Sequence, residues 1–316
     1  MKLQPGLVVA GFGRHVLVET PSGERLICHP RGKKSLAVVG DQIQWQPTQD
    51  EGTIEKIEPR RNLFYRQDEV RTKSFAANLD QVLVLIAAEP EFSESQLSRA
   101  LIAAEAEHIT PIIALNKSDL TEPFAKAWAR LMPYREMGYE VISLALKPKT
   151  LSRTGKTDVL VSEELVQTQG LAALLRGKTT LVLGPSGAGK STLINALVPQ
   201  AQVFTQEISQ ALNSGKHTTT STTWYWVDPA KTTALIDSPG FQEFGLNHLE
   251  AMHLASYMPD FKVHVPNCKF YNCSHLHEPG CGVIESMKSG VSQHKISAER
   301  YRIYSSLFAE LSQTRY

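Results

Sequence analysis

The first part of the chain carries short apolar runs separated by glycine and proline turns. Up to about residue 66 these runs cover 7–10, 15–18, 25–28, 36–39 and 43–45. Short, closely spaced strands of this kind are typical of a small antiparallel barrel. Five or so strands in about 60 residues suit an OB-fold, and we predict one here.

The hydrophobic pattern changes after Arg71. Residues 82–87 form a continuous apolar run, which is typical of a parallel strand buried on both faces. Further runs alternate with amphipathic segments, and the predicted elements are strands over 111–115, 139–143, 179–183 and 233–236 and helices over 93–108, 128–138 and 190–197. This alternation predicts a doubly wound α/β sheet. Beyond residue 244 the pattern becomes helical and ends in a predicted helix over 298–311.

The composition is that of an ordinary globular protein. The 316 residues allow two or three domains, with 42% hydrophobic and 21% charged residues. A net charge of +1 excludes a protein that coats nucleic acid through charge alone. No run approaches the roughly 20 apolar residues of a membrane helix, and the N-terminus lacks the features of a signal peptide. We therefore expect a cytoplasmic protein that does not enter a membrane.

A P-loop is the clearest motif. Residues 184–191 read G-P-S-G-A-G-K-S between a predicted strand and a predicted helix. Backbone amides of such a loop turn toward phosphates, and the helix N-terminus favours negative charge. Lys190 would contact the β- and γ-phosphates and assist catalysis, and Ser191 would bind Mg²⁺. The residues expected to bind nucleotide here are Gly184, Pro185, Ser186, Gly187, Ala188, Gly189, Lys190, Ser191 and Thr192.

A base-reading loop is predicted at the end of another strand. Residues 116–119 read N-K-S-D, and the predicted nucleotide contacts are Asn116, Lys117, Ser118 and Asp119. The Asp119 carboxylate can accept two hydrogen bonds from the ring N–H and the exocyclic amine of guanine, and adenine offers no such pair. The carboxyl end of a strand is also where such sheets bind ligands. Together with the P-loop, this motif predicts specificity for guanine nucleotides.

Two further elements would sense the γ-phosphate. Residues 237–240 read D-S-P-G after a predicted strand, so Asp237 would hold Mg²⁺ through water and the Gly240 amide would contact the γ-phosphate. A polar segment over 213–220 lies between this element and the P-loop. A threonine there can complete the Mg²⁺ shell, and Thr219 is preferred over Thr218.

The order of these motifs is rotated. A conventional GTPase runs from P-loop to switch threonine, D-x-x-G and N-K-x-D, but here N-K-S-D comes first. The same sheet forms if its old ends are joined and new ends are opened elsewhere, which compact domains tolerate. The switch over 237–244 then leads directly into the C-terminal part of the chain, where it could act as a lever.

The residue that orients the attacking water is not evident. Ras-like enzymes place a glutamine directly after the D-x-x-G glycine, but this chain has Phe241, which has no hydrogen-bonding group. His217 is the nearest sequence candidate for a catalytic role, although a histidine there could equally contact a partner. Slow turnover until a partner assists is the other interpretation.

Three of the four cysteines gather in one short segment. Cys268, Cys273 and Cys281 lie close to His275, and His277 is an alternative fourth ligand. Three thiolates and an imidazole suit a closed tetrahedral structural Zn²⁺ site. Cys28 stands alone and is expected to be a buried, inert thiol.

Basic residues occur at 31–34 and 60–61, both in or near the predicted barrel. Barrels of this type often bind RNA. A solvated charge run is an equally good interpretation of these residues on charge alone.

Taken together, these residues resemble the RsgA family, also called YjeQ or EngC. The likeness covers nearly the whole chain: the barrel, N-K-S-D ahead of the P-loop, G-K-H-T-T at 215–219, D-S-P-G-F at 237–241 and the cysteine cluster with E-P-G at 278–280. It implies an N-terminal OB-fold RNA-binding domain (1–68), a circularly permuted GTPase domain (69–245) and a zinc-binding, mostly helical domain (246–316). The family ligands match Cys268, Cys273, His275 and Cys281, and its switch histidine matches His217.

The resemblance also implies a function. Members bind the immature 30S subunit, including 16S rRNA and 30S proteins, in late assembly and hydrolyse GTP weakly until that subunit stimulates them. We expect a monomer that acts in this way. Two departures are Lys216, where the family has arginine, which loses bidentate geometry, and the blurred S-A element at 143–145, so no base contact is assigned there. The polar insertion over 147–162 has no assigned role.

Two alternatives stay open at this stage. One is a GTP-gated RNA-binding protein with negligible turnover, which Phe241 favours. The other is an ATP-dependent P-loop enzyme, which Asp119 disfavours.

Overall fold

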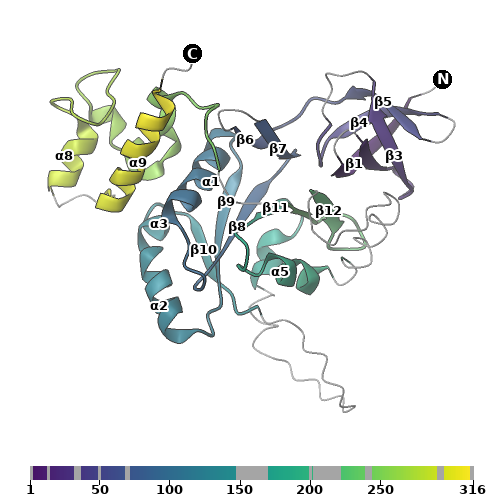
Figure 1. The fold of residues 1–316 in the computed structure, drawn as a ribbon, viewed down its shortest axis with the longest axis horizontal. Helices are drawn as coiled ribbons and strands as arrows, with labels where there is room; N and C mark the ends of the chain where they lie inside the picture. Colours follow the sequence, from purple (N-terminus) through teal and green to yellow (C-terminus); the bar gives the residue numbers. More distant parts are fainter. Residues whose placement is uncertain are drawn as a thin grey trace, which may run out of the picture.

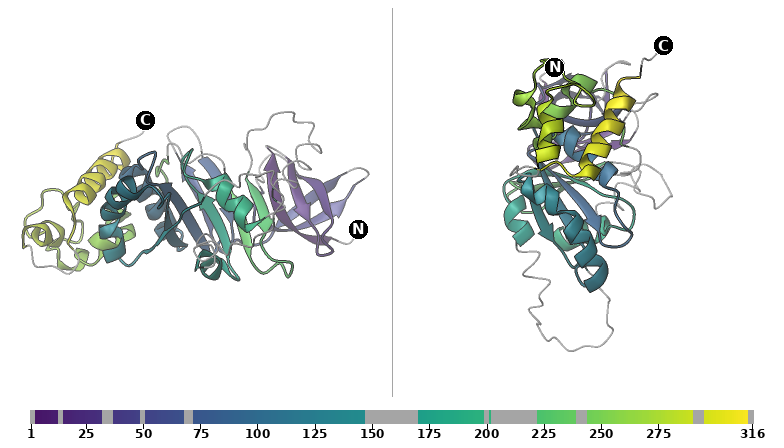
Figure 2. Two further views of the ribbon diagram at one scale, coloured as in Figure 1. Left: turned by 90° about the horizontal axis from the view of Figure 1, so that it is seen from below. Right: turned by 90° about the vertical axis from the view of Figure 1, so that its left-hand side faces the viewer.

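The computed structural model describes residues 3–12, 15–31, 37–48, 51–67, 72–146, 170–198, 201, 222–238, 244–289 and 295–313. Within them, a β-barrel and a C-terminal helical unit lie at opposite ends of the long axis, with an α/β unit between them (Figures 1 and 2). The segments 147–169 and 202–221 fall outside this description, and so does the 147–162 insertion.

The barrel is formed by the first strands of the chain. They are β1 (Gln4–Phe12), β2 (His15–Glu19), β3 (Arg25–Pro30), β4 (Gln42–Pro47) and β5 (Gly52–Ile57). Their order is β1-β2-β3-β5-β4, and β4 pairs again with β1, so the barrel closes as predicted for an OB-like fold. Burial raises the pKa of the Cys28 thiol to about 12, which keeps it protonated inside the barrel.

One predicted barrel strand was wrong. Residues 37–39 form no strand, and Val39 makes only an isolated bridge to Ala76. The cause is the buried carboxylate of Asp41, which accepts the Val38 amide at 2.8 Å and a two-pronged bond from Arg60. This network folds the segment into a turn, and β5, which the apolar pattern did not reveal, supplies the fifth strand.

The central sheet continues the barrel. A hairpin, β6 (Leu63–Gln67) and β7 (Thr72–Ala77), precedes it, and its strands are β8 (Gln81–Ala87), β9 (Thr110–Asn116), β10 (Glu140–Ser143), β11 (Thr179–Leu183), β12 (Thr223–Trp226) and β13 (Ala234–Asp237). Their order is β10-β9-β8-β11-β13-β12, and only β12 of these runs antiparallel to its neighbour. The predicted strands agree to within one residue, but β12 was not predicted.

Helices cover both faces of this sheet. They are α1 (Glu94–Ala106), α2 (Thr121–Arg130), α3 (Met132–Glu136) and α5 (Lys190–Leu197). Alternate residues of β8 face opposite cores, one shared with α1 and the other with α5, which makes the sheet doubly wound. The single helix predicted over 128–138 is instead a pair that starts earlier, because Pro133 begins a new helix in α3.

The C-terminal unit is built from short helices. They are η1 (Ala251–Tyr257), α7 (Pro259–Lys262), η2 (Val265–Asn267), α8 (Gly282–Ser289) and α9 (Ala298–Leu311), the last as predicted. Buried Arg300 joins this unit to the α/β unit, because it pairs with Asp260 at 2.8 and 2.9 Å and donates to Ser98 Oγ at 2.8 Å. Among the described helices, none is long and apolar enough to cross a membrane.

Candidate functional site

The predicted motifs meet at one edge of the sheet. Strands β9, β11 and β13 are parallel, so their carboxyl ends lie at the same edge, with β8 between β9 and β11. The N-K-S-D loop follows β9, the P-loop follows β11, and Asp237 closes β13. Parallel α/β sheets bind ligands at this edge.

The P-loop depends on glycine at two close approaches. A Cβ at Gly184 would lie 2.4 Å from the Leu85 carbonyl oxygen, which only glycine avoids. Gly189 has a φ of +101° and caps α5, and a Cβ there would lie 2.4 Å from Asn116 Nδ2. The loop therefore lies tightly between β8 and the N-K-S-D loop, with the N-terminus of α5 beneath it.

Asn116 joins the two loops directly. Its side chain is 1% exposed, and Nδ2 donates to the Ala188 carbonyl at 2.9 Å across 72 residues of sequence. Its Oδ1 accepts the Leu146 amide at 2.9 Å. The segments 116–119 and 184–191 therefore converge, as the sequence predicted.

The rest of the N-K-S-D loop is held by backbone groups that were not predicted. Lys117, at φ +69°, donates its ammonium to the Glu89 carbonyl. The Ser118 amide donates to the Leu144 carbonyl at 2.9 Å, and the exposed Asp119 follows. The sequence carried no signal for this support, because main-chain groups rather than side chains provide it.

A cation and a carboxylate face each other beneath the P-loop. Lys190 Nζ lies 2.5 Å from Asp237 Oδ1, and these side chains are 15% and 8% exposed. Ser191 is exposed and Thr192 is half-buried at the start of α5. The ammonium can meet a phosphate, and the carboxylate and hydroxyl are oxygen groups of the kind that Mg²⁺ prefers.

Several predicted site residues cannot be placed. Thr219 and His217 fall in 202–221, and Gly240 and Phe241 fall in 239–243, all outside the described residues. Ser238, next to Asp237, is 2% exposed, and its hydroxyl has no hydrogen-bond partner in the described part of the chain.

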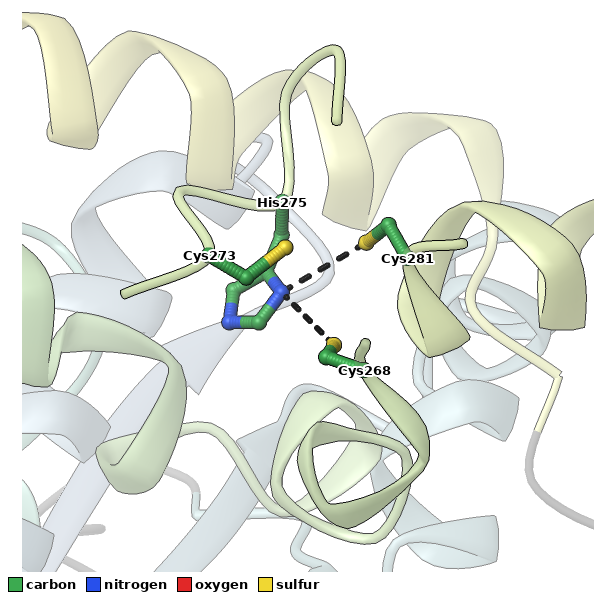
Figure 3. A group of neighbouring side chains, drawn as sticks. All are labelled: Cys268, Cys273, His275 and Cys281. Carbon is green, nitrogen blue, oxygen red and sulfur yellow. Dashed lines mark hydrogen bonds between the residues drawn. The ribbon is translucent and has the colours of Figure 1, made fainter. Parts of the chain in front are cut away.

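A second site gathers the predicted metal ligands. The ligand atoms of Cys268, Cys273, His275 and Cys281 all lie within 4.8 Å of one another. Figure 3 shows the Cys268 and Cys281 sulfurs directed at His275 Nδ1, each at 3.5 Å. His277 is exposed, whereas His275 belongs to the group that could hold a metal ion. Three sulfurs and one imidazole nitrogen form a donor set of the kind found in closed structural metal sites.

The surroundings of this cluster hold it in place. Burial raises the pKa of the Cys273 thiol to about 12 and lowers the pKa of His275, so a bound cation would have to displace the thiol protons. Two tyrosine hydroxyls of α9 donate to carbonyl groups of the ligand-bearing loop. Tyr301 donates to the His275 carbonyl at 2.9 Å and Tyr304 to the Ser274 carbonyl at 2.9 Å.

Glu278 fixes the turn between the ligands. Its carboxylate accepts the Ser274 amide at 2.8 Å and the Ser274 hydroxyl at 2.5 Å. Burial acts to raise the pKa of Glu278, but these bonds and the His277 amide outweigh it and hold the pKa at about 2. The turn therefore carries a carboxylate that stays ionised at neutral pH.

Known proteins share this architecture. The RsgA GTPase family model matches residues 57–247. The small ribosomal subunit biogenesis GTPase RsgA of Variovorax paradoxus is 69% identical, covering 99% of this chain and 94% of that protein. The protein of the same name in Paraburkholderia xenovorans is 47% identical, with coverages of 98% and 93%.

Two solved structures also align over nearly the whole chain. The circularly permuted GTPase YloQ has a TM-score of 0.69 and 26% identity, covering 100% of this chain and 98% of that one. YjeQ from Thermotoga maritima has a TM-score of 0.69 and 27% identity, with coverages of 99% and 100%. The rotated motif order therefore corresponds to a known permuted fold.

The family model covers more than half of the 316 residues, and relatives match almost end to end. This decides against the ATP-dependent and non-hydrolysing alternatives. The protein is a GTP hydrolase with a circularly permuted GTPase fold, an N-terminal OB-like barrel and a C-terminal Cys₃His cluster, and it belongs to the RsgA GTPase family.

Proposed function

We propose that this GTPase binds the small ribosomal subunit during its late assembly and that the subunit stimulates hydrolysis of GTP to GDP and phosphate. The observation that carries the proposal is the 69% identity, over 99% of the chain, to a protein named as a small ribosomal subunit biogenesis GTPase. Contacts to 16S rRNA and 30S proteins, a monomeric state and a cytoplasmic location belong to this proposal.

The nucleotide lies across the convergent loops in this proposal. Asn116, Lys117, Ser118 and Asp119 surround guanine, and the P-loop holds the phosphates. The residues from Gly184 through Thr192 line the phosphate side, with Lys190 on the β- and γ-phosphates. The contact between Asn116 and Ala188 supports this arrangement, because it fixes the distance between the base end and the phosphate end.

Mg²⁺ and the attacking water complete the reaction centre. Ser191, Thr219 and Asp237 hold Mg²⁺ directly or through water, and Gly240 contacts the γ-phosphate. Phe241 cannot orient water, so His217 takes that role once the subunit is bound. The two carboxyl oxygens of Asp237, one of them beside Lys190, support its part in this assignment.

The Cys₃His cluster holds one structural Zn²⁺ in this proposal. Its sulfur and imidazole donors and its small spread fit a tetrahedral ion without an open position. The barrel over 1–68 contacts RNA, the GTPase domain spans 69–245, and the zinc domain spans 246–316.

Phosphate release with and without purified small subunits tests the proposal. We expect several-fold faster release with small subunits and no change with large subunits at the same concentration. Sedimentation should recover the protein with small subunits in the presence of a non-hydrolysable GTP analogue and much less with GDP. Equal release in all three conditions would refute the role in small-subunit assembly.

A further inference from the structure

Glu19 of β2 joins the barrel to the α/β unit. Its side chain is 5% exposed, and Oε1 accepts the Trp226 indole N–H at 2.9 Å and the Lys231 ammonium at 2.6 Å. The other oxygen, Oε2, accepts Arg25 Nε at 2.8 Å from the neighbouring barrel strand. Trp226 ends β12, and Lys231 lies in the turn between β12 and β13. One carboxylate therefore connects the barrel to the edge of the sheet. We call these four residues the Glu19 clasp.

The groups of the clasp are held in place from both sides. Burial acts to raise the pKa of Glu19, but the bonds from Lys231, Arg25 and Trp226 outweigh it and hold the pKa below its usual range. The Lys231 backbone has a φ of +54°, which is uncommon for residues other than glycine and persists where the surroundings fix it. The Trp224 ring meets the Trp226 ring edge-on at 5.0 Å. The clasp is therefore an ionised carboxylate with fixed donors.

Strand β12 lies at the junction of the two units. The strand order β13-β12-β1 places it between the α/β unit and the barrel (Figures 1 and 2). Thr223, at the start of β12, pairs with Ala10 of β1 on one side and with Asp237 of β13 on the other. In the described part of the sheet, Ala10 and Thr223 form the only registered pair between β12 and the barrel. The other end of β12 reaches the barrel through the clasp.

The residue opposite Thr223 carries a carboxylate of the reaction centre. Asp237 is flanked by Val182 of β11 and Thr223 of β12, and its Oδ1 lies 2.5 Å from Lys190 Nζ. A strand of four residues makes few backbone bonds, so its ends open easily unless other contacts fix them. The clasp fixes the end of β12 that has no ladder partner in the barrel. Order along β12 therefore supports the backbone that carries Asp237.

We propose that Glu19 is a positioning residue for Asp237, which acts by holding β12 between the barrel and β13. Loss of the clasp lets β12 separate from the barrel and loosens the pairing of Thr223 with Asp237. The Asp237 carboxylate is then less often in the position from which it can hold Mg²⁺. The P-loop and the N-K-S-D loop do not depend on β12, so nucleotide binding without Mg²⁺ is unchanged. The inference rests on the proposed role of Asp237 in holding Mg²⁺.

Nucleotide binding by the full chain with and without Mg²⁺ tests the inference. The probe is a fluorescent, non-hydrolysable GTP analogue, titrated at increasing Mg²⁺ concentrations and in buffer without divalent cations. Glu19→Gln keeps the size of the side chain and removes its charge. We expect the Mg²⁺ concentration that gives half of the Mg²⁺-dependent gain in affinity to rise about two- to fivefold in this variant. Its Kd without divalent cations should equal that of the wild type.

Glu55→Gln is the matched control. Glu55 is also a barrel carboxylate with two side-chain donors, since it accepts Gln46 Nε2 at 2.6 Å and Arg31 Nη1 at 2.7 Å. Its side chain is 15% exposed. Its strand, β5, pairs with β3 and β4 and not with β12 in the described sheet. We expect the Kd and the Mg²⁺ dependence of Glu55→Gln to equal those of the wild type.

Hydrogen exchange and tryptophan emission separate positioning from general destabilisation. In Glu19→Gln without nucleotide, amides of β12 and β13 should exchange faster, whereas amides of β8 and β9 should not change. Trp226→Phe keeps an aromatic ring and removes the indole donor, so we expect a smaller shift in Mg²⁺ dependence in the same direction. The change in tryptophan emission that Glu19→Gln causes should be absent when Trp226→Phe is also present, because Trp226 is the indole that bonds Glu19.

Three results would overturn the inference: an unchanged Mg²⁺ dependence in Glu19→Gln, an equal loss of affinity without Mg²⁺, or the same shift in Glu55→Gln. If Glu19→Gln does not fold, Trp226→Phe decides, and unchanged exchange in β12 and β13 of that variant refutes the inference. Asp237→Asn tests the role of Asp237 separately. Mg²⁺ dependence that survives Asp237→Asn would remove that role and the inference with it, whereas its loss beside a normal Glu19→Gln would refute only the inference.

Discussion

Replacing Asn116 by alanine should separate the base-binding loop from the P-loop. The side chain donates to the Ala188 carbonyl and accepts the Leu146 amide, each at 2.9 Å, and it is 1% exposed. Alanine would leave both backbone groups buried without these partners. An unsatisfied buried polar group costs about 1–3 kcal/mol, and water entering the gap would recover part of this. We therefore expect a loss of about 2–4 kcal/mol.

This loss should appear mainly in nucleotide affinity. If all of it is expressed in binding, the Kd for GDP rises about 30- to 1,000-fold, since about 1.4 kcal/mol corresponds to a factor of ten. Titration of a fluorescent GDP analogue gives the Kd, and urea unfolding gives the part of the loss that affects global stability. Asn116→Asp should be at least as harmful, because its carboxylate would face the Ala188 carbonyl.

Asn62 offers a matched control. It makes the same pair of bonds, donating to the Leu79 carbonyl at 2.9 Å and accepting the Leu79 amide at 2.8 Å, but at the far end of the sheet. Asn62→Ala should lower stability and leave the Kd for GDP unchanged. A folded Asn116→Ala protein whose Kd stays within about threefold of the wild type would refute the reasoning, because 2 kcal/mol predicts far more.

Three further predictions concern Asp119, Cys281 and His248. Asp119→Asn should lose GTP affinity by tenfold or more and gain affinity for xanthosine triphosphate, as competition binding would show; unchanged base preference would refute the assignment. Cys281→Ser should lose a stoichiometric metal ion by elemental analysis and lower the melting temperature, and a strong chelator should do the same to the wild type but not to the variant. Burial lowers the pKa of His248 to about 4, so the unfolded chain takes up a proton that the folded chain resists. Stability should therefore fall as the pH drops from about 6.5 to 4, and His248→Phe, which keeps a ring against Tyr65, should flatten this dependence in urea titrations at pH 7 and 5.

The sequence predicted the fully buried strands most accurately. Strands β8, β9 and β11 are apolar on both faces, so their runs stand out without any tertiary information. The segment predicted over 36–39 looked equally apolar, but the buried carboxylate of Asp41, paired with Arg60, determines the fold of residues 37–39. Asp41 and Arg60 lie 19 residues apart in the sequence, so their ion pair cannot be read from the hydrophobic periodicity. Strand β12 was missed although it is no shorter than β10 and β13, which were predicted; its T-W-Y-W sequence contains no aliphatic residue.

The chemistry of the sites was predicted more fully than their supports. Motif residues gave the P-loop, the base-reading loop and the metal cluster, and the resemblance favoured His275 over His277. His275 is 3% exposed, and its Nδ1 lies 3.5 Å from the sulfurs of Cys268 and Cys281. The bond from the Asn116 side chain to the Ala188 carbonyl, which joins the two loops, was not evident from the motif. The hydrogen bonds that the main chain of Leu144 and Leu146 makes to the N-K-S-D loop could not be predicted from the sequence.

The rotated order has a physical consequence for coupling. Strand β12 pairs with barrel strand β1 through Ala10 and Thr223, and the chain beyond β13 reaches the hairpin and the C-terminal unit at Phe244. Each appended unit is thus joined to the sheet next to a segment that would respond to the γ-phosphate. Coupling free energy is reciprocal, so a partner that binds either unit more tightly in the GTP state must raise GTP affinity by the same factor. A partner on the barrel or the C-terminal unit can therefore set nucleotide affinity without contacting the nucleotide.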